Sequence, residues 1–599
     1  MVFKLTFVDF IYRYFFWAGS GILKMYSFLP EDIKRAGMRL HYEVYASIVG
    51  FLVILSSLSS IFLIFILNIA LAGLLPLIFR LIISLILMVL PAFVLVFFGM
   101  AFPKLLAANR VSSYDQEAPY AVAYLGIMTS GGMSPYIALE RLGYARTIFK
   151  KISLLATRFT VMVRAIGWDP MTAMEDIAKR NPSTLLRDLV MGFIATLRAG
   201  GDIADYLRKK STDLFNALVT KIKASGERMS VILESYLAVA FILLLTLNAI
   251  YLVSLSITNI ALPGINEVTL FISSYVVLPF MSGLMLYLSD MVQYKEPGME
   301  LGPYKIFFLI SFPIIIALSA VLVAPYFIPP VHPFFKYTER FRAPIRHLME
   351  SFNVSDVYAP GMGFAISLSI ATIPAAVADY IICGRQRKIA IGIVRFLRDL
   401  VEVRKTGLSP EKCIVSLANR DYGLFTKYLR EIATQISLGF SLTKILERAF
   451  KKIRSWRARV FLYVLTEAIE VGGGTPEALE NIAHFAELTE NLERERSASL
   501  RTLIIIPYLG AIVIISSIVL LTSFMSTAAA GIVAYTVAAK MVVPAAILNV
   551  YFMGLVAGKT SAGTVSSGFK HAALLCAISL LTIFASPYLA EAIRGISGG

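Results

Sequence analysis

The chain is poor in the residues that disulfides, metal sites and most active sites need. Its 599 residues include only three cysteines and five histidines, and only 16% of the residues are charged. Cys383, Cys413 and Cys576 are scattered, so neither a disulfide framework nor a zinc site is indicated. No histidine forms an HExxH motif or lies near a nucleophile and a carboxylate in the sequence. We therefore expect no enzymatic activity, no bound metal and no cofactor.

A nucleotide-binding loop is also missing, although one segment imitates it. Residues 554–560 have the sequence GLVAGKT. The phosphate-binding loop needs four residues between its glycines and follows a strand, whereas three residues separate Gly554 from Gly558. We interpret this segment as a short cytoplasmic loop that follows a membrane helix.

Apolar sequence, by contrast, is abundant. Hydrophobic residues make up 57% of the chain, more than a soluble core of this size requires. A membrane-spanning helix takes about 20 mostly apolar residues. We therefore predict an all-α, multi-pass protein of the cytoplasmic membrane with about nine transmembrane helices, at 46–71, 77–101, 231–257, 268–289, 304–328, 361–383, 502–525, 530–556 and 571–590.

The distribution of charge predicts which segments face the cytoplasm. Residues 104–230 (the first block) hold 18 Lys and Arg, and residues 384–500 (the second block) hold 20, together 38 of the chain's 56. Cytoplasmic segments of membrane proteins are enriched in these residues, so we place both blocks there. The alternative is that part of the excess serves anionic lipid or an acidic partner. With nine spans, the N-terminus is then cytoplasmic and the C-terminus outside.

The first 45 residues lack the clean apolar run of a cleavable signal peptide. They are rich in aromatic residues, among them Trp17, and we expect an amphipathic segment at the cytoplasmic interface. The predicted organisation is this segment at 1–45, a transmembrane hairpin at 46–103, the first block at 104–230, a transmembrane bundle at 231–383 with an outer loop at 329–360, the second block at 384–500 and C-terminal transmembrane helices at 501–599.

The two blocks share short glycine- and proline-containing motifs at nearly equal spacing. GGMSP and RAGGD in the first block correspond to TGLSP and VGGGT in the second. Pro135 precedes Gly201 by 66 positions, and Pro410 precedes Gly474 by 64. A repeat of this length indicates an internal duplication. The glycine-rich segments suit tight turns between helices; they are either turns alone or turns that present a partner-binding edge.

Helix starts recur inside the blocks as well. Ser409 is a typical N-cap with Pro410 at the first helical position, and Ser134 with Pro135 repeats the pattern. Second starts follow at Asp169 and Ser441. Apolar residues recur every three or four positions, so we expect each block to be a bundle of about five or six amphipathic helices.

The chain has two helical blocks between membrane helices, and each block has a G-x-S-P or G-x-D-P helix start and a later glycine-rich turn. This arrangement resembles the F-domain platform proteins of type II secretion and type IV pilus machines. The two-block form is most similar to their archaeal branch, which includes archaellum and adhesive-pilus platforms related to tight-adherence pilus proteins. The resemblance implies a non-enzymatic membrane platform. It would bind a cytoplasmic hexameric secretion ATPase and couple its motion to the insertion of pilin-like subunits into a filament.

The resemblance also implies functional positions. The motif residues are Gly132, Pro135, Gly167, Gly200, Gly201, Gly407, Pro410, Gly439, Gly473 and Gly474. Family members commonly have a glutamate before the glycine-rich turn; Glu470 fills that role in the second block, whereas Arg198 lies near the turn of the first. The candidate docking residues for the ATPase are Arg208, Lys209, Lys210, Lys451, Lys452 and Arg454. The alternative for each cluster is a basic helix face that contacts only solvent or lipid.

Two other functions compete with the platform. A transporter needs ionisable groups at mid-membrane, and Arg80 and Lys540 are the ionisable residues that stand out in the predicted spans. Lys540 is either a buried functional charge, or a residue that lies near the outer interface or pairs with a neighbouring helix. A non-catalytic scaffold of another membrane complex fits equally.

The expected partners are the ATPase, pilin-like subunits and the lipid bilayer, with no nucleic acid, and the chain is a monomer or a homodimer.

Overall fold

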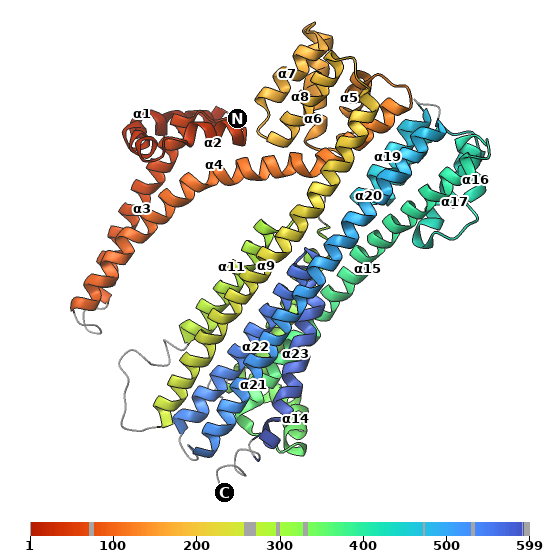
Figure 1. Ribbon diagram of the computed structural model, residues 1–599. Helices are drawn as coiled ribbons and strands as arrows, with labels where there is room; N and C mark the ends of the chain where they lie inside the picture. Colours follow the sequence, from red (N-terminus) through yellow and green to blue (C-terminus); the bar gives the residue numbers. More distant parts are fainter. Residues whose placement is uncertain are drawn as a thin grey trace. The chain divides into compact units, whose positions relative to one another are not determined.

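The protein is helical throughout the part of the chain that the structure describes (Figure 1). This computed structural model describes residues 2–70, 77–256, 271–294, 300–327, 334–470, 474–528, 533–589 and 591. Within these ranges there is no strand, which confirms the all-α prediction. The α-helices are α1 (Val2–Met25), α2 (Leu29–Ala36), α3 (Tyr42–Ala70), α4 (Leu77–Ser130), α5 (Pro135–Leu142), α6 (Ile152–Thr160), α7 (Pro170–Arg180), α8 (Thr184–Arg198), α9 (Ile203–Ser256), α11 (Leu278–Val292), α12 (Gly302–Ile306), α13 (Phe312–Leu322), α14 (Phe334–Ser351), α15 (Ala359–Arg404), α16 (Pro410–Leu417), α17 (Thr426–Ser437), α18 (Leu442–Lys452), α19 (Trp456–Glu470), α20 (Pro476–Arg501), α21 (Ile505–Ala528), α22 (Val533–Ala562) and α23 (Gly568–Phe584).

Several helices of the described chain have the length and the apolar composition of membrane spans. Eight helical stretches there are long and apolar enough to cross a bilayer, at Tyr42–Phe62, Pro91–Ser130, Ile203–Thr246, Ser273–Val292, Gly302–Tyr326, Asp356–Arg404, Pro476–Phe524 and Ala539–Ala562. The ninth predicted span, at 571–590, corresponds to the shorter apolar helix α23. Helices satisfy their own backbone hydrogen bonds, which lipid cannot do for them. The chain is thus a multi-pass membrane protein.

Two compact units divide the chain, and each is described by itself. The first unit contains residues 1–125 and 135–207, and the second contains residues 126–134 and 208–599. In the first unit α1 packs closely on α3, because small residues meet at the crossing. The backbone of Gly19 lies against Ser47, and Gly50 lies against Ala18.

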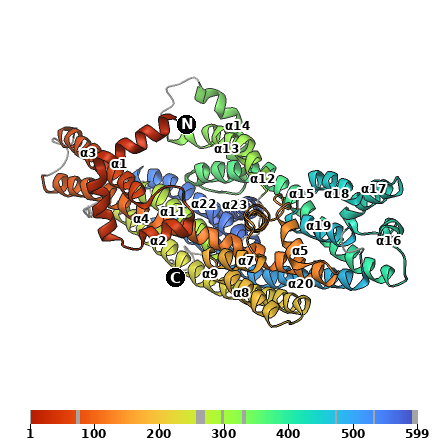
Figure 2. The ribbon, with the colours of Figure 1, turned by 90° about the horizontal axis from the view of Figure 1, so that it is seen from above.

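The order of helices repeats along the chain. The sequence α5, α6, α7, α8 in the first block returns as α16, α17, α18, α19 in the second, and the starts of corresponding helices are displaced by nearly the same distance along the chain. Long helices flank each set: α4 and α9 in the first block, α15 and α20–α21 in the second. In the second unit α16–α19 gather at one end of α15, which continues into the apolar bundle (Figures 1 and 2). The duplication in sequence is therefore a duplication of helix order.

In the second unit the long helices α9 and α20–α21 lie side by side, and equivalent positions face each other. The rings of Phe215 and Phe485 have centroids 5.9 Å apart, and Lys223 pairs with Glu495 at 3.0 Å. The separation of these partners along the chain is close to the displacement between the two sets of helices. Contacts between nearly equivalent residues are what a twofold relation between two copies produces. The pairing of α9 with α20–α21 is thus the one expected of internal pseudo-twofold symmetry.

The α22–α23 hairpin depends on glycine. Side chains at Gly554 or Gly558 would overlap the backbone of Ala572 or Gly568 on the facing helix. The four-residue spacing of two glycines is the usual device for close helix approach in membranes. The GLVAGKT segment thus lies inside α22, and the interpretation of it as a cytoplasmic loop was wrong. The connection comes later, at 563–567.

Near the predicted outer loop, the turn at Asp356–Tyr358 packs against α22, and the helix α14 packs against α13 and α15. Lys540 pairs with Asp356 at 3.8 Å, and its Nζ lies 6.0 Å from the centroid of the Tyr326 ring. Arg342 lies over the same ring at 5.3 Å and pairs with Glu339. Lys540 thus pairs with a neighbouring segment, the second of the two roles considered for it.

Candidate functional site: the motif turns and a buried lysine

The motif turns of the second block converge. Gly407 and Gly474 have φ of +89° and +58°, a backbone conformation that glycine adopts without strain. Gly474 packs on the ring of Pro410, at the start of α16. The Arg404 guanidinium donates to the carbonyl of Gly474 at 3.0 Å and to that of Leu408 at 2.7 Å. Arg404 therefore binds the two turns together, a role that the sequence pattern did not single out.

Helix caps explain why Glu470 and Arg198 differ between the blocks. In the first block the Asp169 carboxylate accepts the N–H of Thr172 and caps α7. In the second block Ser441 occupies the N-cap of α18, but its side chain makes no capping bond. The Glu470 carboxylate, at the end of α19, accepts the N–H and the hydroxyl of Thr443 instead. Glu470 thus supplies the acceptor that Ser441 does not.

Arg198 stands where the second block has Glu470, and its positive charge matches a negatively charged partner, Glu175. At the end of α8 it lies 3.4 Å from Glu175 of α7, and Lys179 reaches the same carboxylate at 2.8 Å. The Lys179 ammonium, with a contribution from Arg198, lowers the pKa of Glu175. In both blocks, therefore, the end of the helix before the glycine-rich turn is tied to the helix that precedes it in the set, by different chemistry.

The remaining motif residues of the first block repeat the backbone geometry of the second. Gly132 has the same φ as Gly407, +89°, and Gly167 has the same φ as Gly439, +81°. Gly200 is also left-handed, at +69°, and the Gly201 N–H donates to the carbonyl of Thr196. Pro135 opens α5 as Pro410 opens α16. Gly473 lies outside the described residues.

One predicted turn of the first block reaches the second block. Within the second unit, Asn481 on α20 donates to the hydroxyl of Ser130 at 3.1 Å. Gly131 lies against Ala478, in the first turn of α20. The GGMSP turn thus lies near the start of the helix that follows VGGGT, a proximity that no spacing in sequence indicates.

The cores of the blocks have diverged. In the first unit a pocket of about 70 Å³ lies among apolar side chains of α4, α6, α8 and α9, including Ala121. When α5 is aligned with α16, the position that corresponds to Ala121 is Phe396, whose ring packs on Tyr422 and Phe425. An aromatic ring therefore occupies, in the second block, a position where the first block has only a methyl group.

A buried carboxylate also distinguishes the first block. Glu117 is buried, and its carboxylate accepts three backbone N–H groups at residues 150–152. Gly392 takes the corresponding place in the second block and lets Tyr422 and Phe425 approach α15 directly. The contact between the long helix and the segment that begins the second short helix is thus made by hydrogen bonds in the first block and by close packing in the second.

The six basic docking candidates lie at two different elements of the fold. Arg208, Lys209 and Lys210 lie near the start of α9, whereas Lys451, Lys452 and Arg454 lie at the end of α18 and just beyond it. The positions in the first block that correspond to Lys451 and Lys452 are Lys179 and Arg180, so the two clusters are not equivalent in the repeat. Lys452 pairs with Glu431, and Arg454 lies 3.8 Å from Glu300. Lys451 is exposed.

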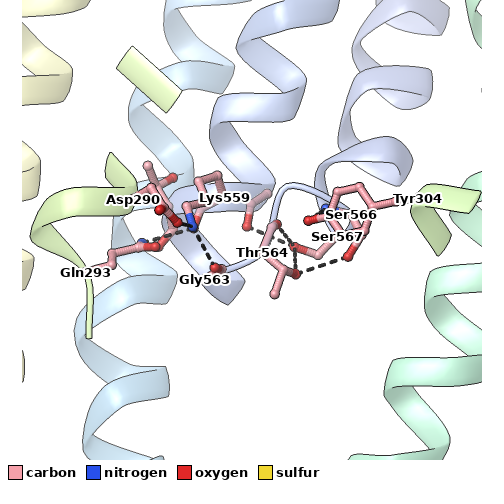
Figure 3. Close-up of polar contacts among 10 residues, drawn as sticks. Asp290, Gln293, Tyr304, Lys559, Gly563, Thr564, Ser566 and Ser567 are labelled. Atoms are coloured by element: carbon pink, nitrogen blue, oxygen red, sulfur yellow. Dashed lines mark hydrogen bonds and ion pairs between the residues drawn. The ribbon is translucent and has the colours of Figure 1, made fainter. Parts of the chain in front are cut away.

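An ion pair of a buried lysine with a half-exposed aspartate clamps one end of the apolar bundle (Figure 3). The Lys559 ammonium, 6% exposed, lies 2.6 Å from Asp290, whose side chain is 44% exposed, and donates to the carbonyl of Gly563 at 3.0 Å. Gln293 donates to the carbonyls of Lys559 and Thr560, and the Tyr304 hydroxyl accepts the N–H of Ser566. Removal of Asp290 would leave the buried Lys559 ammonium without its carboxylate. The clamp therefore joins α11, α12 and the α22–α23 connection.

Asp379 is a further ionisable residue that the sequence analysis passed over. It lies inside the predicted span 361–383 and is only 9% exposed. The signal was available, because a carboxylate inside an apolar run is unusual. Asp290 lies one residue beyond the predicted span 268–289 and was missed because the span boundary was drawn before it.

The fold defines a class before any comparison: a multi-pass, all-helical membrane protein with one helical module present twice. Comparisons with known proteins identify this module. Residues 121–249 and 396–522 match the family described as type II secretion system (T2SS), protein F. The chain therefore carries two regions that match the domain of this family, one in each block. The displacement between the starts of the two matches equals the displacement between the starts of α5 and α16.

One curated protein is similar to this chain over most of its length. An uncharacterized protein of Methanocaldococcus jannaschii is 20% identical over 519 residues, which cover 82% of each chain. No solved structure matches the chain. The family matches begin after the predicted blocks begin, and they extend into the apolar parts of α9 and α21. The block limits at 104–230 and 384–500 remain predictions.

Proposed function

We propose that this protein is the membrane platform of an archaeal type IV pilus or archaellum-like assembly machine, without enzymatic activity of its own. It would anchor a cytoplasmic hexameric secretion ATPase and couple the motion of that enzyme to the insertion of pilin subunits into the filament. The observation that carries the proposal is the double match to protein F on one multi-pass chain. The relative from an archaeon supports the archaeal assignment.

Continuous helices offer a physical route for the coupling. α9 has 54 residues and α15 has 46, and each runs without interruption from a block into the apolar bundle. A helix of this length transmits displacement along its axis because its backbone hydrogen bonds are internal. A force on a block would therefore reach the apolar bundle, one end of which is held together by the clamp of Lys559 and Asp290.

The docking hypothesis concerns the basic side chains of the blocks. Among the candidates, Lys210 is half-buried and Lys451 is exposed. Reversal of Lys452 or Arg454 would break the local pairs with Glu431 and Glu300, so these positions test docking less cleanly. The sharper variant is therefore Lys210→Glu with Lys451→Glu.

The proposal is tested by purifying the tagged protein from native membranes and identifying its partners by mass spectrometry. We expect a hexameric secretion ATPase together with pilin-like subunits. The Lys210→Glu/Lys451→Glu variant should recover less ATPase, whereas the control Arg340→Glu/Arg346→Glu, on α14 at the predicted outer side, should recover as much as the unchanged protein. Recovery of neither partner, under conditions that preserve other membrane complexes, would refute the platform function. Equal recovery in both variants would refute only the electrostatic docking.

A further inference from the structure

One face of α15 changes character abruptly along its length. Its exposed side chains are apolar or aromatic through one stretch, and several are about half exposed or more: Ile370, Ile373, Val377, Tyr380 and Ile381. Within the next two turns the basic side chains Arg385, Arg387 and Lys388 follow. At 100° per residue, most of these positions fall on one side of the helix. An apolar stripe, a tyrosine and then cations follow the order of acyl chains, interface and headgroups in a bilayer.

The three cations lack the carboxylate partners that several other basic residues of the same block have. No carboxylate in the described chain lies within ion-pair distance of Arg385, Arg387 or Lys388, and Arg385 contacts the hydroxyl of Tyr428, at 3.5 Å. Farther from the apolar stretch, three cations form ion pairs within the block. Arg398 lies 3.4 Å from Glu487, Lys405 lies 2.6 Å from Glu480, and Arg420 lies 3.0 Å from Asp399.

We propose that Arg385, Arg387 and Lys388 bind the phosphate groups of anionic lipids and hold the base of the second block on the membrane surface. Three positive charges that the described fold leaves without carboxylates, directly after a lipid-facing stripe, are complementary to a negatively charged headgroup layer. The first block does not repeat this surface. The corresponding positions there are Arg110, Ser112 and Ser113, and Arg110 donates to the carbonyl of Arg35. The surface therefore belongs to the second block.

The test is a lipid titration of the purified full chain in detergent, followed by native mass spectrometry. Phosphatidylglycerol and phosphatidylcholine are added separately, and the ratio of their apparent affinities is measured. The variant Arg385→Gln/Arg387→Gln/Lys388→Gln should lose preference for phosphatidylglycerol by about fivefold per cation removed, the factor expected for a basic residue at an anionic surface. The proposal needs neither the ATPase nor pilin, so its outcome is independent of the proposed function.

The matched control is Arg398→Gln/Lys405→Gln/Arg420→Gln, which changes the net charge equally but removes paired cations. It should keep the preference of the unchanged protein. Equal loss in both variants would show a bulk charge effect and overturn the proposal. An unchanged preference for phosphatidylglycerol in the Arg385→Gln/Arg387→Gln/Lys388→Gln variant would also overturn the proposal. These cations would then be a candidate surface for an acidic protein partner. Displacement of the lipid by inorganic phosphate at comparable concentration would identify a free-phosphate site instead of a lipid surface.

Discussion

At the scale of single residues, the two blocks solve the same problem with different side chains. The N-terminus of α7 is capped by the adjacent Asp169, and that of α18 is capped by Glu470 from another helix. Loss of a capping acceptor costs about 1 kcal/mol. Glu470→Ala and Asp169→Ala should therefore each lower the midpoint of thermal unfolding of the purified full chain.

Ser441→Ala is the matched control for the capping prediction, because the Ser441 side chain makes no capping bond. It should leave the midpoint nearly unchanged. A loss at Ser441 as large as that at Glu470 would show that the capping bond seen here does not stabilise α18.

Backbone conformation gives a second prediction at this scale. Gly132 and Gly407 both have φ of +89°, and no atom lies within 4 Å of where a Cβ would be. Alanine at either position would meet no steric clash but would be strained by about 1 kcal/mol, because L-residues rarely adopt this conformation. We expect Gly132→Ala and Gly407→Ala to destabilise the protein in thermal unfolding.

Gly384 provides the control for the glycine prediction. It lies inside α15 with equal open space around its Cβ position, but in helical conformation. Gly384→Ala should be neutral or stabilising because alanine favours helix. Destabilisation by all three substitutions alike would mean that positive φ is not the cause.

At the scale of elements, the α22–α23 hairpin is a tightly packed helix pair built on glycine. Gly558 lies directly against the backbone of Gly568, which cannot move aside as a side chain could. Gly558→Ala should cost about 1–3 kcal/mol, as overpacking does, and lower the thermal midpoint in detergent. Gly283→Ala on α11, where no atom lies within 4 Å, should not. Equal effects of the two would show that the close approach is absent.

At the scale of the whole molecule, the internal duplication supplies the symmetry that a dimer of single-domain chains would have. Equivalent residues of α9 and α20–α21 face each other, as Lys223 and Glu495 do. A dimer with twofold symmetry would place identical residues at such an interface. Here the two positions differ in sequence, so one chain can place opposite charges where a symmetric dimer would place like charges.

The predicted topology is tested at the same scale. With nine spans, α14 faces outward and α18 faces the cytoplasm. In a Cys383→Ser background, a cysteine at Glu350 should react with a membrane-impermeant maleimide on intact cells, and one at Lys451 only after permeabilisation; both positions are exposed. Labelling of both in intact cells would contradict the predicted topology.

The sequence by itself determined the class of this protein. Apolar runs of spanning length, the GGMSP and TGLSP starts and the repeated glycine-rich turns are local signals. They depend on periodicity and turn chemistry within a few residues, and so they indicated the helical fold, the membrane spans and the family. The GLVAGKT segment misled because its glycines serve helix packing against α23, which no local pattern indicates.

Only the tertiary structure decided which distant residues meet. The capping of α18 by Glu470, the joining of two turns by Arg404 and the pairing of Lys559 with Asp290 connect positions 27, 70 and 269 residues apart. Contacts at such separations depend on how whole helices pack. The same holds for the basic residues, because the sequence shows where the cations are, whereas the fold decides which of them a carboxylate neutralises and which remain available for a partner.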